Sequence, residues 1–269
     1  MALPFATDDG IGARATLGLI LLQADETLEN EARELLPTAG VALHHSRIVM
    51  PPVVSHETLA GMTATLPVAA ELLPQADFDV IGYGCTSGAT VIGPAGVAAA
   101  INRVHPAAKV TDPMSAVVAA CRVRGLKRLG FVTPNVAEVS AAMRGFLRDA
   151  GFEIGAFGSF EQGDDRVVAR IAPASVLAAI EHVGGRTDCD GVFVSCTNLR
   201  TAGIAAAAAR RIGKPVISSN LALLWHMLDL AGVPFAPLGD DTFFAAALTA
   251  LSRAIADLVA SGFKTWPKA

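Results

Sequence analysis

The feature that most constrains the fold of this chain is a pattern that occurs twice. In "FDVIGYGCTSGAT" (78–90) an apolar run is followed by Cys-Thr and small polar residues, and "CDGVFVSCTNLRT" (189–201) repeats this arrangement. A second pair of segments matches at a similar spacing, since "TLGLILL" (16–22) corresponds to "RLGFVTP" (128–134). An offset of about 110 residues is too long for a solenoid repeat, so it predicts two similar α/β units.

Short apolar runs alternate with longer helical patterns, which predicts parallel sheets covered by helices on both faces. We expect strands at 17–22, 41–50, 78–84, 108–113, 128–134 and 214–220, and helices at 24–36, 56–73, from the first Cys-Thr to about 103, and from about 115. The segment from 220 to about 260 has no counterpart in the first half, so we expect it to pack back against the first unit. The predicted domains are 1–117 plus 221–269, which is discontinuous, and 118–220.

The composition excludes several classes of function. The 269 residues carry a formal net charge of −4 and no basic stripe with interleaved aromatics, so nucleic acid is not an expected partner. No apolar run reaches the roughly 18–20 residues of a membrane span, and the acidic balance disfavours a membrane surface. The start of the chain lacks the basic and apolar regions of a signal peptide, so we expect a cytoplasmic protein. The four cysteines and six histidines show neither a disulfide framework nor metal-ligand spacing, so no metal is expected.

The two Cys-Thr motifs are the candidate catalytic elements. Ligands of parallel α/β sheets bind beyond the carboxyl ends of the strands, so two facing units would place Cys85 and Cys196 on opposite sides of one cleft. A thiol has an ordinary pKa of about 8.5, which a helix N-terminus lowers, so one cysteine could act as a thiolate base and the other as a thiol acid. The polar residues beside them would form an anion site suited to a carboxylate: Thr86, Ser87, Thr197 and Asn198.

Two kinds of chemistry fit a pair of facing thiols. They could remove a proton from one face of a planar carbanion and return it to the other, with each sulfur roughly 3–3.5 Å from the reacting carbon. Alternatively, one cysteine could add to a double bond and leave after rotation. The remaining cysteines, Cys121 and Cys189, are expected to be small buried apolar residues.

These motifs resemble the aspartate/glutamate racemase superfamily, within it the branch of maleate cis-trans isomerases and arylmalonate decarboxylases. The resemblance covers roughly 14–235 and includes "GCTSGAT", "SCTNLRT", "DETLENE" and "FVTPNVAEV". It implies a cofactor-independent enzyme with two pseudo-symmetric Rossmann-like (flavodoxin-like) parallel-sheet domains and an active site in the cleft between them. The decarboxylases keep only the second cysteine, so the presence of both implies an isomerase or racemase.

Three residues depart from the maleate isomerase pattern. Asp25 stands near a family asparagine, Asn135 near a family tyrosine, and Asp165 in "GDDRVVARI" (163–171) near another family asparagine. A carboxylate at position 25 would repel a dicarboxylate and attract an ammonium group. The chain looks closest to the ectoine-utilisation A proteins, which implies an amino acid such as 2,4-diaminobutyrate or its N-acetyl derivative as substrate.

Structural roles compete with some of these assignments. Asp25 suits the first turn of a helix, and Asp164 and Asp165 suit a helix cap. Asp112, before a proline, is typical of a turn. Tyr83 should point away from the neighbouring cysteine because side chains alternate along a strand.

Other functions remain open. Maleate isomerisation would use Cys85 to add to the alkene, and arylmalonate-type decarboxylation is a further alternative within the family. Gly82, Gly84 and Gly88 form a weak match to a dinucleotide-binding loop, although a cysteine inside it has no role with phosphate. A ligand-binding protein without catalysis would keep the same cleft. A homo-oligomer is expected, as for many soluble enzymes.

Overall fold

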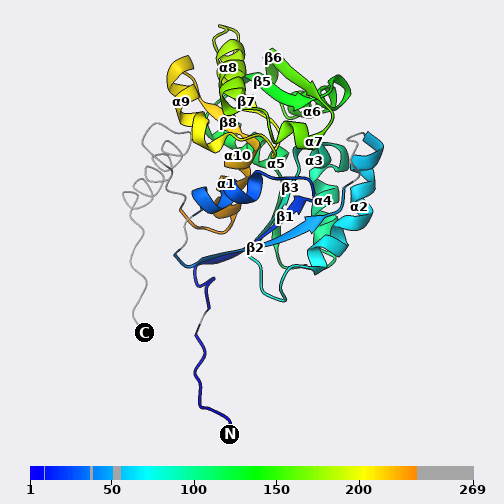
Figure 1. Cartoon of the computed structure of the whole chain (residues 1–269), viewed down its shortest axis with the longest axis vertical. Coiled ribbons are helices and arrows are strands. Elements are labelled where there is room, and N and C mark those ends of the chain that lie inside the picture. Colours follow the sequence, from blue (N-terminus) through cyan, green and yellow to red (C-terminus); the bar gives the residue numbers. More distant parts are fainter. Residues whose placement is uncertain (9, 37–38, 51–55, 235–269) are drawn as a thin grey trace, which may run out of the picture.

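The computed structural model describes residues 1–8, 10–36, 39–50 and 56–234. These residues form two parallel-sheet units, seen one above the other in Figure 1. The predicted α/β class with two similar units is confirmed.

The first unit has the strand order β2-β1-β3-β4, in which every neighbouring pair is parallel. Its strands are β1 (Ala15–Leu22), β2 (Val41–Ile48), β3 (Val80–Gly84) and β4 (Lys109–Thr111). Its helices are α1 (Leu28–Leu35), α2 (His56–Glu71), α3 (Thr86–Ile92), α4 (Pro94–Ile101) and α5 (Pro113–Val123). The order reverses direction between β1 and β3, and ligands of such sheets bind at this reversal.

The second unit repeats the same order as β6-β5-β7-β8, again with parallel neighbours. Its strands are β5 (Arg128–Asn135), β6 (Glu153–Gln162), β7 (Gly191–Val194) and β8 (Val216–Ser218). Its helices are α6 (Ala137–Asp149), α7 (Asp165–Val168), α8 (Pro173–Gly184) and α9 (Ala202–Ile212). Strands β3 and β7 therefore occupy equivalent places, and a cysteine follows each of them directly or within two residues.

Helix α10 (Ser219–Leu230) joins the two units. It follows β8 but packs against α5 and β3 of the first unit, and most of its side chains are buried. This agrees with the expected return of the chain to the first unit. The rest of the expected helix lies outside the described residues. The domain bounds stay a prediction, and the proposed boundary between 117 and 118 falls inside α5.

Two helices differ locally from expectation. The predicted helix after the first Cys-Thr is two helices, because Gly93 adopts φ +79° and Pro94 starts α4 without a backbone donor. Helix α5 begins at Pro113, earlier than expected, because Asp112 caps it by accepting hydrogen bonds from the N–H groups of Met114 and Ser115.

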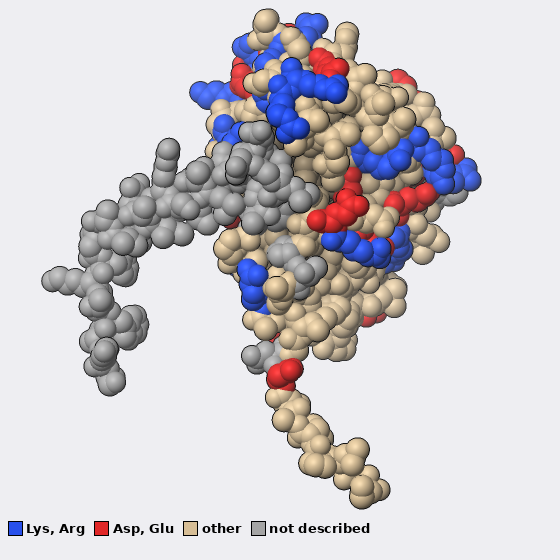
Figure 2. All heavy atoms as spheres, turned by 60° about the vertical axis from the view of Figure 1, so that its left-hand side comes forward, with Lys and Arg blue, Asp and Glu red and all other residues tan. Residues whose placement is uncertain are grey.

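Positive and negative side chains lie interspersed on the face shown in Figure 2, which agrees with the mixed charge pattern of the sequence. None of the described helices is long and apolar enough to cross a membrane. Among the described residues, no group of three or more His, Cys, Asp or Glu could hold a metal ion.

Candidate active site

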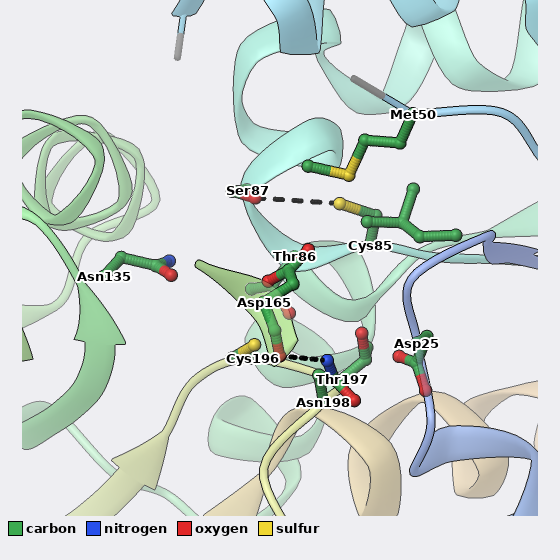
Figure 3. Close-up of a pocket in the computed structure, with 11 residues that line it drawn as sticks. Asp25, Met50, Cys85, Thr86, Ser87, Asn135, Asp165, Cys196, Thr197 and Asn198 are labelled. Carbon is green, nitrogen blue, oxygen red and sulfur yellow. Dashed lines mark hydrogen bonds between the residues drawn. The ribbon is translucent and has the colours of Figure 1, made fainter. Parts of the chain in front are cut away.

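A pocket lies where the carboxyl ends of the two sheets meet. Figure 3 shows its lining, which includes every residue that the sequence singled out: Asp25, Cys85, Thr86, Ser87, Asn135, Asp165, Cys196, Thr197 and Asn198. Sequence reasoning missed Leu22 and Met50, the apolar part of the lining, although each lies at the carboxyl end of a strand. The structure thus brings the predicted residues together, while their individual roles stay predictions.

Cys85 directly follows β3 and caps α3. Its extended backbone, with φ −149° and ψ 113°, turns the sulfur towards the helix, where Sγ accepts the Gly88 N–H at 3.2 Å. The Ser87 hydroxyl lies 3.6 Å from the same sulfur. Burial raises the pKa of the Cys85 thiol to about 11, and these two hydrogen bonds oppose the rise.

Cys196 lies in a different backbone conformation. Its φ is +93°, a region that side chains other than glycine rarely adopt, and such strain is common at functional sites. Its own N–H donates to the Ser219 hydroxyl at 3.1 Å. Burial raises the pKa of the Cys196 thiol well above its usual value, and the negative charges of Asp165 and Asp25 raise it further.

The threonines that follow the cysteines connect the two units. Thr86 Oγ1 donates to Ser219 Oγ at 2.9 Å, so one serine serves both Cys-Thr turns. Thr197 Oγ1 donates to the Gly84 carbonyl at 3.3 Å, directly before the other cysteine. Both hydroxyls, predicted to bind substrate, therefore make bonds that hold the two motifs in register.

The side chain of Asn198 also makes hydrogen bonds within the protein. Its side-chain oxygen accepts the Glu26 N–H at 2.9 Å, and its amide nitrogen donates to the carbonyls of Ala24 and Asp165 at 3.3 and 3.0 Å. These bonds occupy the amide that was predicted to contact substrate. They place the two acidic residues of the pocket, since Asn198 holds both the loop that carries Asp25 and the backbone of Asp165.

Asp25 has one satisfied and one unsatisfied oxygen. Its Oδ1 accepts the N–H groups of Thr27 and Leu28, both at 2.8 Å, so the expected role at the first turn of α1 is real. Its Oδ2 is buried and has no hydrogen-bond partner in the described part of the chain. Burial raises the pKa of Asp25, and the two backbone bonds oppose that rise. A role at the start of α1 therefore explains the contacts of Oδ1 but not the burial of Oδ2.

Asp164 and Asp165 divide the roles that the sequence left open. Asp164 caps α7 by accepting the Arg166 N–H at 2.9 Å and is exposed. Asp165 is the first residue of that helix and lines the pocket beside Cys196 (Figure 3). Burial, together with the charges of Asp25 and Asp164, raises the pKa of Asp165 to about 6.

Asn135 lies on the opposite side of the pocket from Asp25 (Figure 3). It is the last residue of β5, while Asp25 follows β1, so the two residues come from equivalent strand ends. The hydroxyl of Ser140 fixes its backbone by donating to the Asn135 carbonyl at 2.8 Å. This position suits a substrate donor.

A buried glutamate that sequence reasoning missed locks the two units together. Glu31 of α1 accepts the N–H groups of Thr201 and Ala202 at 2.6 and 2.9 Å, at the start of α9. Asn220 donates to the same carboxylate at 2.7 Å and to the Thr197 carbonyl at 2.9 Å. The sequence of α1 predicted only an amphipathic helix. The role of Glu31 could not be seen in it, because its partners are about 170 residues away along the chain.

Tyr83 corrects one expectation. Its side chain does not point away from the cysteine, because its hydroxyl and Cys85 Sγ border the same space at Gly88. Tyr83 and Cys85 are two residues apart, and side chains at that spacing lie on the same face of a strand, so alternation in fact favours their closeness.

The glycines of the weak dinucleotide motif have internal packing roles. A Cβ at Gly82 would lie 2.6 Å from Met227, and one at Gly84 would lie 2.5 Å from Leu28. A Cβ at Gly88 would lie 2.4 Å from the Tyr83 hydroxyl. These close approaches explain the glycines without a bound phosphate.

Comparison with known proteins identifies the family. The arylmalonate decarboxylase family matches residues 17–244, so the chain belongs to this family. The maleate isomerase of Pseudomonas putida is 27% identical over 229 residues, which are 79% of this chain and 90% of that protein. The arylmalonate decarboxylase of Bordetella bronchiseptica is 27% identical over 123 residues, 45% of this chain and 51% of that protein.

Solved structures support the same placement. A crystal structure of maleate isomerase from Pseudomonas putida S16 has a TM-score of 0.77 at 27% identity, covering 86% of this chain and 98% of that one. A cysteine-to-serine mutant of the Nocardia farcinica maleate cis-trans isomerase, with a covalently bound succinylcysteine intermediate, has a TM-score of 0.75 at 25% identity, covering 82% and 94%. The resemblance to the maleate isomerase branch of the aspartate/glutamate racemase superfamily is confirmed, and these relatives agree with an enzyme of the isomerase class.

Proposed function

We propose that this chain is a cofactor-independent isomerase that moves the α-proton of a small amino acid between Cys85 and Cys196. The observation that carries the proposal is the presence of two carboxylates, Asp25 and Asp165, in the same pocket as the two thiols. The substrate would be 2,4-diaminobutyrate or an N-acetyl derivative, which would place the enzyme in ectoine breakdown.

The two acidic side chains favour a substrate that carries an ammonium group. A pair of unit charges 4 Å apart interacts by roughly 4 kcal/mol at an effective dielectric constant of 20. A dicarboxylate would meet this repulsion from both acids, whereas an ammonium group would relieve it. The unpartnered Oδ2 of Asp25 supports this assignment, since buried polar atoms without a partner call for a ligand or ion.

The reaction needs no external reactant. A thiolate takes the α-proton and becomes a thiol, and the electron pair of the broken C–H bond spreads into the neighbouring carboxylate. The opposite thiol then donates its proton to the other face and becomes a thiolate. Ser87 and Asn135 line the part of the pocket opposite Asp25 and are the candidates to hold the substrate carboxylate.

Maleate isomerisation is the second candidate, because the match to the two relatives named maleate isomerase covers 90% and 91% of their own length. In that reaction Cys85 would add to the alkene, the carbon–carbon bond would rotate, and the thiolate would leave. The two carboxylates of the pocket count against this substrate.

Proton NMR in D₂O would separate the candidates. The protein would be incubated with diaminobutyrate, its two mono-N-acetyl forms, aspartate, glutamate and maleate, beside the Cys85→Ser and Cys196→Ser variants. Deuterium at one α-carbon, with inversion that is lost in both variants, is the expected result. Conversion of maleate to fumarate would replace the proposal with the second candidate. Tight ligand binding without any turnover would support a ligand-binding protein without catalysis. Analytical ultracentrifugation of the same sample would test the predicted homo-oligomer.

A further inference from the structure

Tyr83 is the only tyrosine of the chain, and its ring is completely buried at the end of β3. A buried phenol needs a hydrogen-bond partner, because an unpaired hydroxyl in the core costs stability. One contact of this hydroxyl is the Met62 sulfur, 3.6 Å away and a weak acceptor. The other neighbour is the Cys85 side chain. Burial raises the pKa of Tyr83, and the charge of this cysteine contributes to the rise.

The surroundings of Gly88 confirm this closeness independently. A Cβ at this position would lie 2.4 Å from the Tyr83 oxygen and 3.0 Å from Cys85 Sγ. The phenol oxygen and the sulfur therefore both border the space that Gly88 leaves empty.

The direction of the hydrogen bond follows from the chemistry of a buried phenol. Burial and the neighbouring Cys85 raise the pKa of Tyr83 well above its usual value, so the phenol keeps its proton. A neutral phenol facing a thiolate can only donate. Cys85 then has three donors around it, namely this hydroxyl, the Gly88 N–H and the Ser87 hydroxyl.

Cys196 lies among groups that oppose a negative charge. Among the causes that shift its pKa, the Asn198 N–H is the donor, while Asp165 and Asp25 disfavour the thiolate. Asp165 also disfavours a thiolate at Cys85. The two sulfurs differ in that Cys85 faces the Gly88 N–H and the Ser87 hydroxyl, while Cys196 faces Asp25 in addition to Asp165.

We propose that Tyr83 is a positioning residue, whose hydroxyl donates a hydrogen bond to Cys85 Sγ and so selects Cys85 over Cys196 as the thiolate. The inference rests on the proposed function in one respect, namely that Cys85 reacts as a thiolate. Substrate identity does not enter it.

The test measures the pH dependence of Cys85 alkylation by iodoacetamide, with the modified peptides mapped by mass spectrometry. Tyr83→Phe keeps the ring and removes the hydroxyl. We expect the midpoint for Cys85 to rise by about one pH unit and its rate near neutral pH to fall about ten-fold, since a hydrogen bond to a charged group has this effect. The midpoint for Cys196 should not move. In turnover, kcat should fall about as much while KM stays within two-fold.

A second variant tests the same contact without changing the phenol. Gly88→Ala would place a methyl group between the hydroxyl and the sulfur, so the Cys85 midpoint should rise here too. Met62→Leu is the matched control, since it keeps the volume and removes the other contact of the hydroxyl, and it should behave as wild type.

The other ionisable groups that face this pair remain in all three variants. They are Asp165 and Cys196 towards Cys85, and Asp112 towards Tyr83. A folded Tyr83→Phe or Gly88→Ala protein with the wild-type midpoint would overturn the inference. Failure of the proposed function has a different signature, namely turnover that survives in Cys85→Ser.

Discussion

The two Cys-Thr turns follow equivalent strands of equivalent sheets, but their surroundings differ. Cys85 has an ordinary extended backbone, caps a helix and faces hydrogen-bond donors. Cys196 has φ +93°, caps no helix and faces the acidic pair. A repeated dipeptide therefore sets where the sulfurs lie, while residues from other elements give each sulfur different neighbours; in our proposal these neighbours select Cys85 as the thiolate.

Serine substitution of either cysteine is the strongest way to test this difference. We expect each variant to slow inversion by about 10²–10⁴-fold, the usual contribution of one acid or base. In Cys196→Ser, the base Cys85 remains, so deuterium should still enter the enantiomer whose proton faces it. Separate NMR assays of the two enantiomers would measure this. Equal exchange into both enantiomers would contradict the division of roles.

Asparagine substitution of the acidic pair should have a smaller effect. Asp165→Asn and Asp25→Asn each remove one charge from the ammonium site, so kcat/KM should fall about 10- to 100-fold, as for loss of one charged hydrogen bond. Asp164→Asn is the matched control, because Asp164 is exposed and caps α7 without lining the pocket. Steady-state kinetics would check all three. A fall in the control variant equal to that of Asp165→Asn would remove the acidic pair as the explanation.

The pH dependence sharpens the comparison between the neighbouring acids. The pKa of Asp165 is about 6, so its carboxylate is present above pH 6 and is lost as the pH falls through that value. We expect kcat/KM to fall below pH 6 by up to about ten-fold per unit, because this quantity reports the free enzyme. Asp165→Asn should abolish that limb. The pKa of Asp164 is about 2, so its titration lies outside this window.

Glycine substitution should have the smallest effect and opposite signs at the two turns. Cys196→Gly relieves a strained backbone, so we expect the free energy of unfolding to rise by about 1 kcal/mol. Cys85→Gly loses the cap at the Gly88 N–H, and we expect a fall of roughly a few tenths of a kcal/mol, since glycine is itself tolerated at this position. Urea denaturation would measure both. Equal changes at the two sites would show that the backbone difference has no energetic consequence.

Local patterns made much of this molecule predictable. Apolar runs ending in Cys-Thr predicted β3 and β7, and the direction of parallel strands then predicted that both motifs lie at one edge. The break at Gly93 and Pro94 was missed although its signal is local, since a glycine followed by a proline ends a helix. The roles of Asp164 and Asp165 were not separable, because adjacent acids both suit a helix start.

The sequence by itself determined the class of fold, the internal repeat and the two Cys-Thr motifs of the pocket, because hydrophobic periodicity and strand ends are properties of short segments. Asp25, Asn135 and Asp165 were predicted from the family resemblance. Only the tertiary structure decided how those residues are used. In the structure, the amide of Asn198 and the hydroxyls of Thr86 and Thr197 make hydrogen bonds within the protein. Most of these contacts join segments that are more than 100 residues apart, and their geometry depends on how the two units pack.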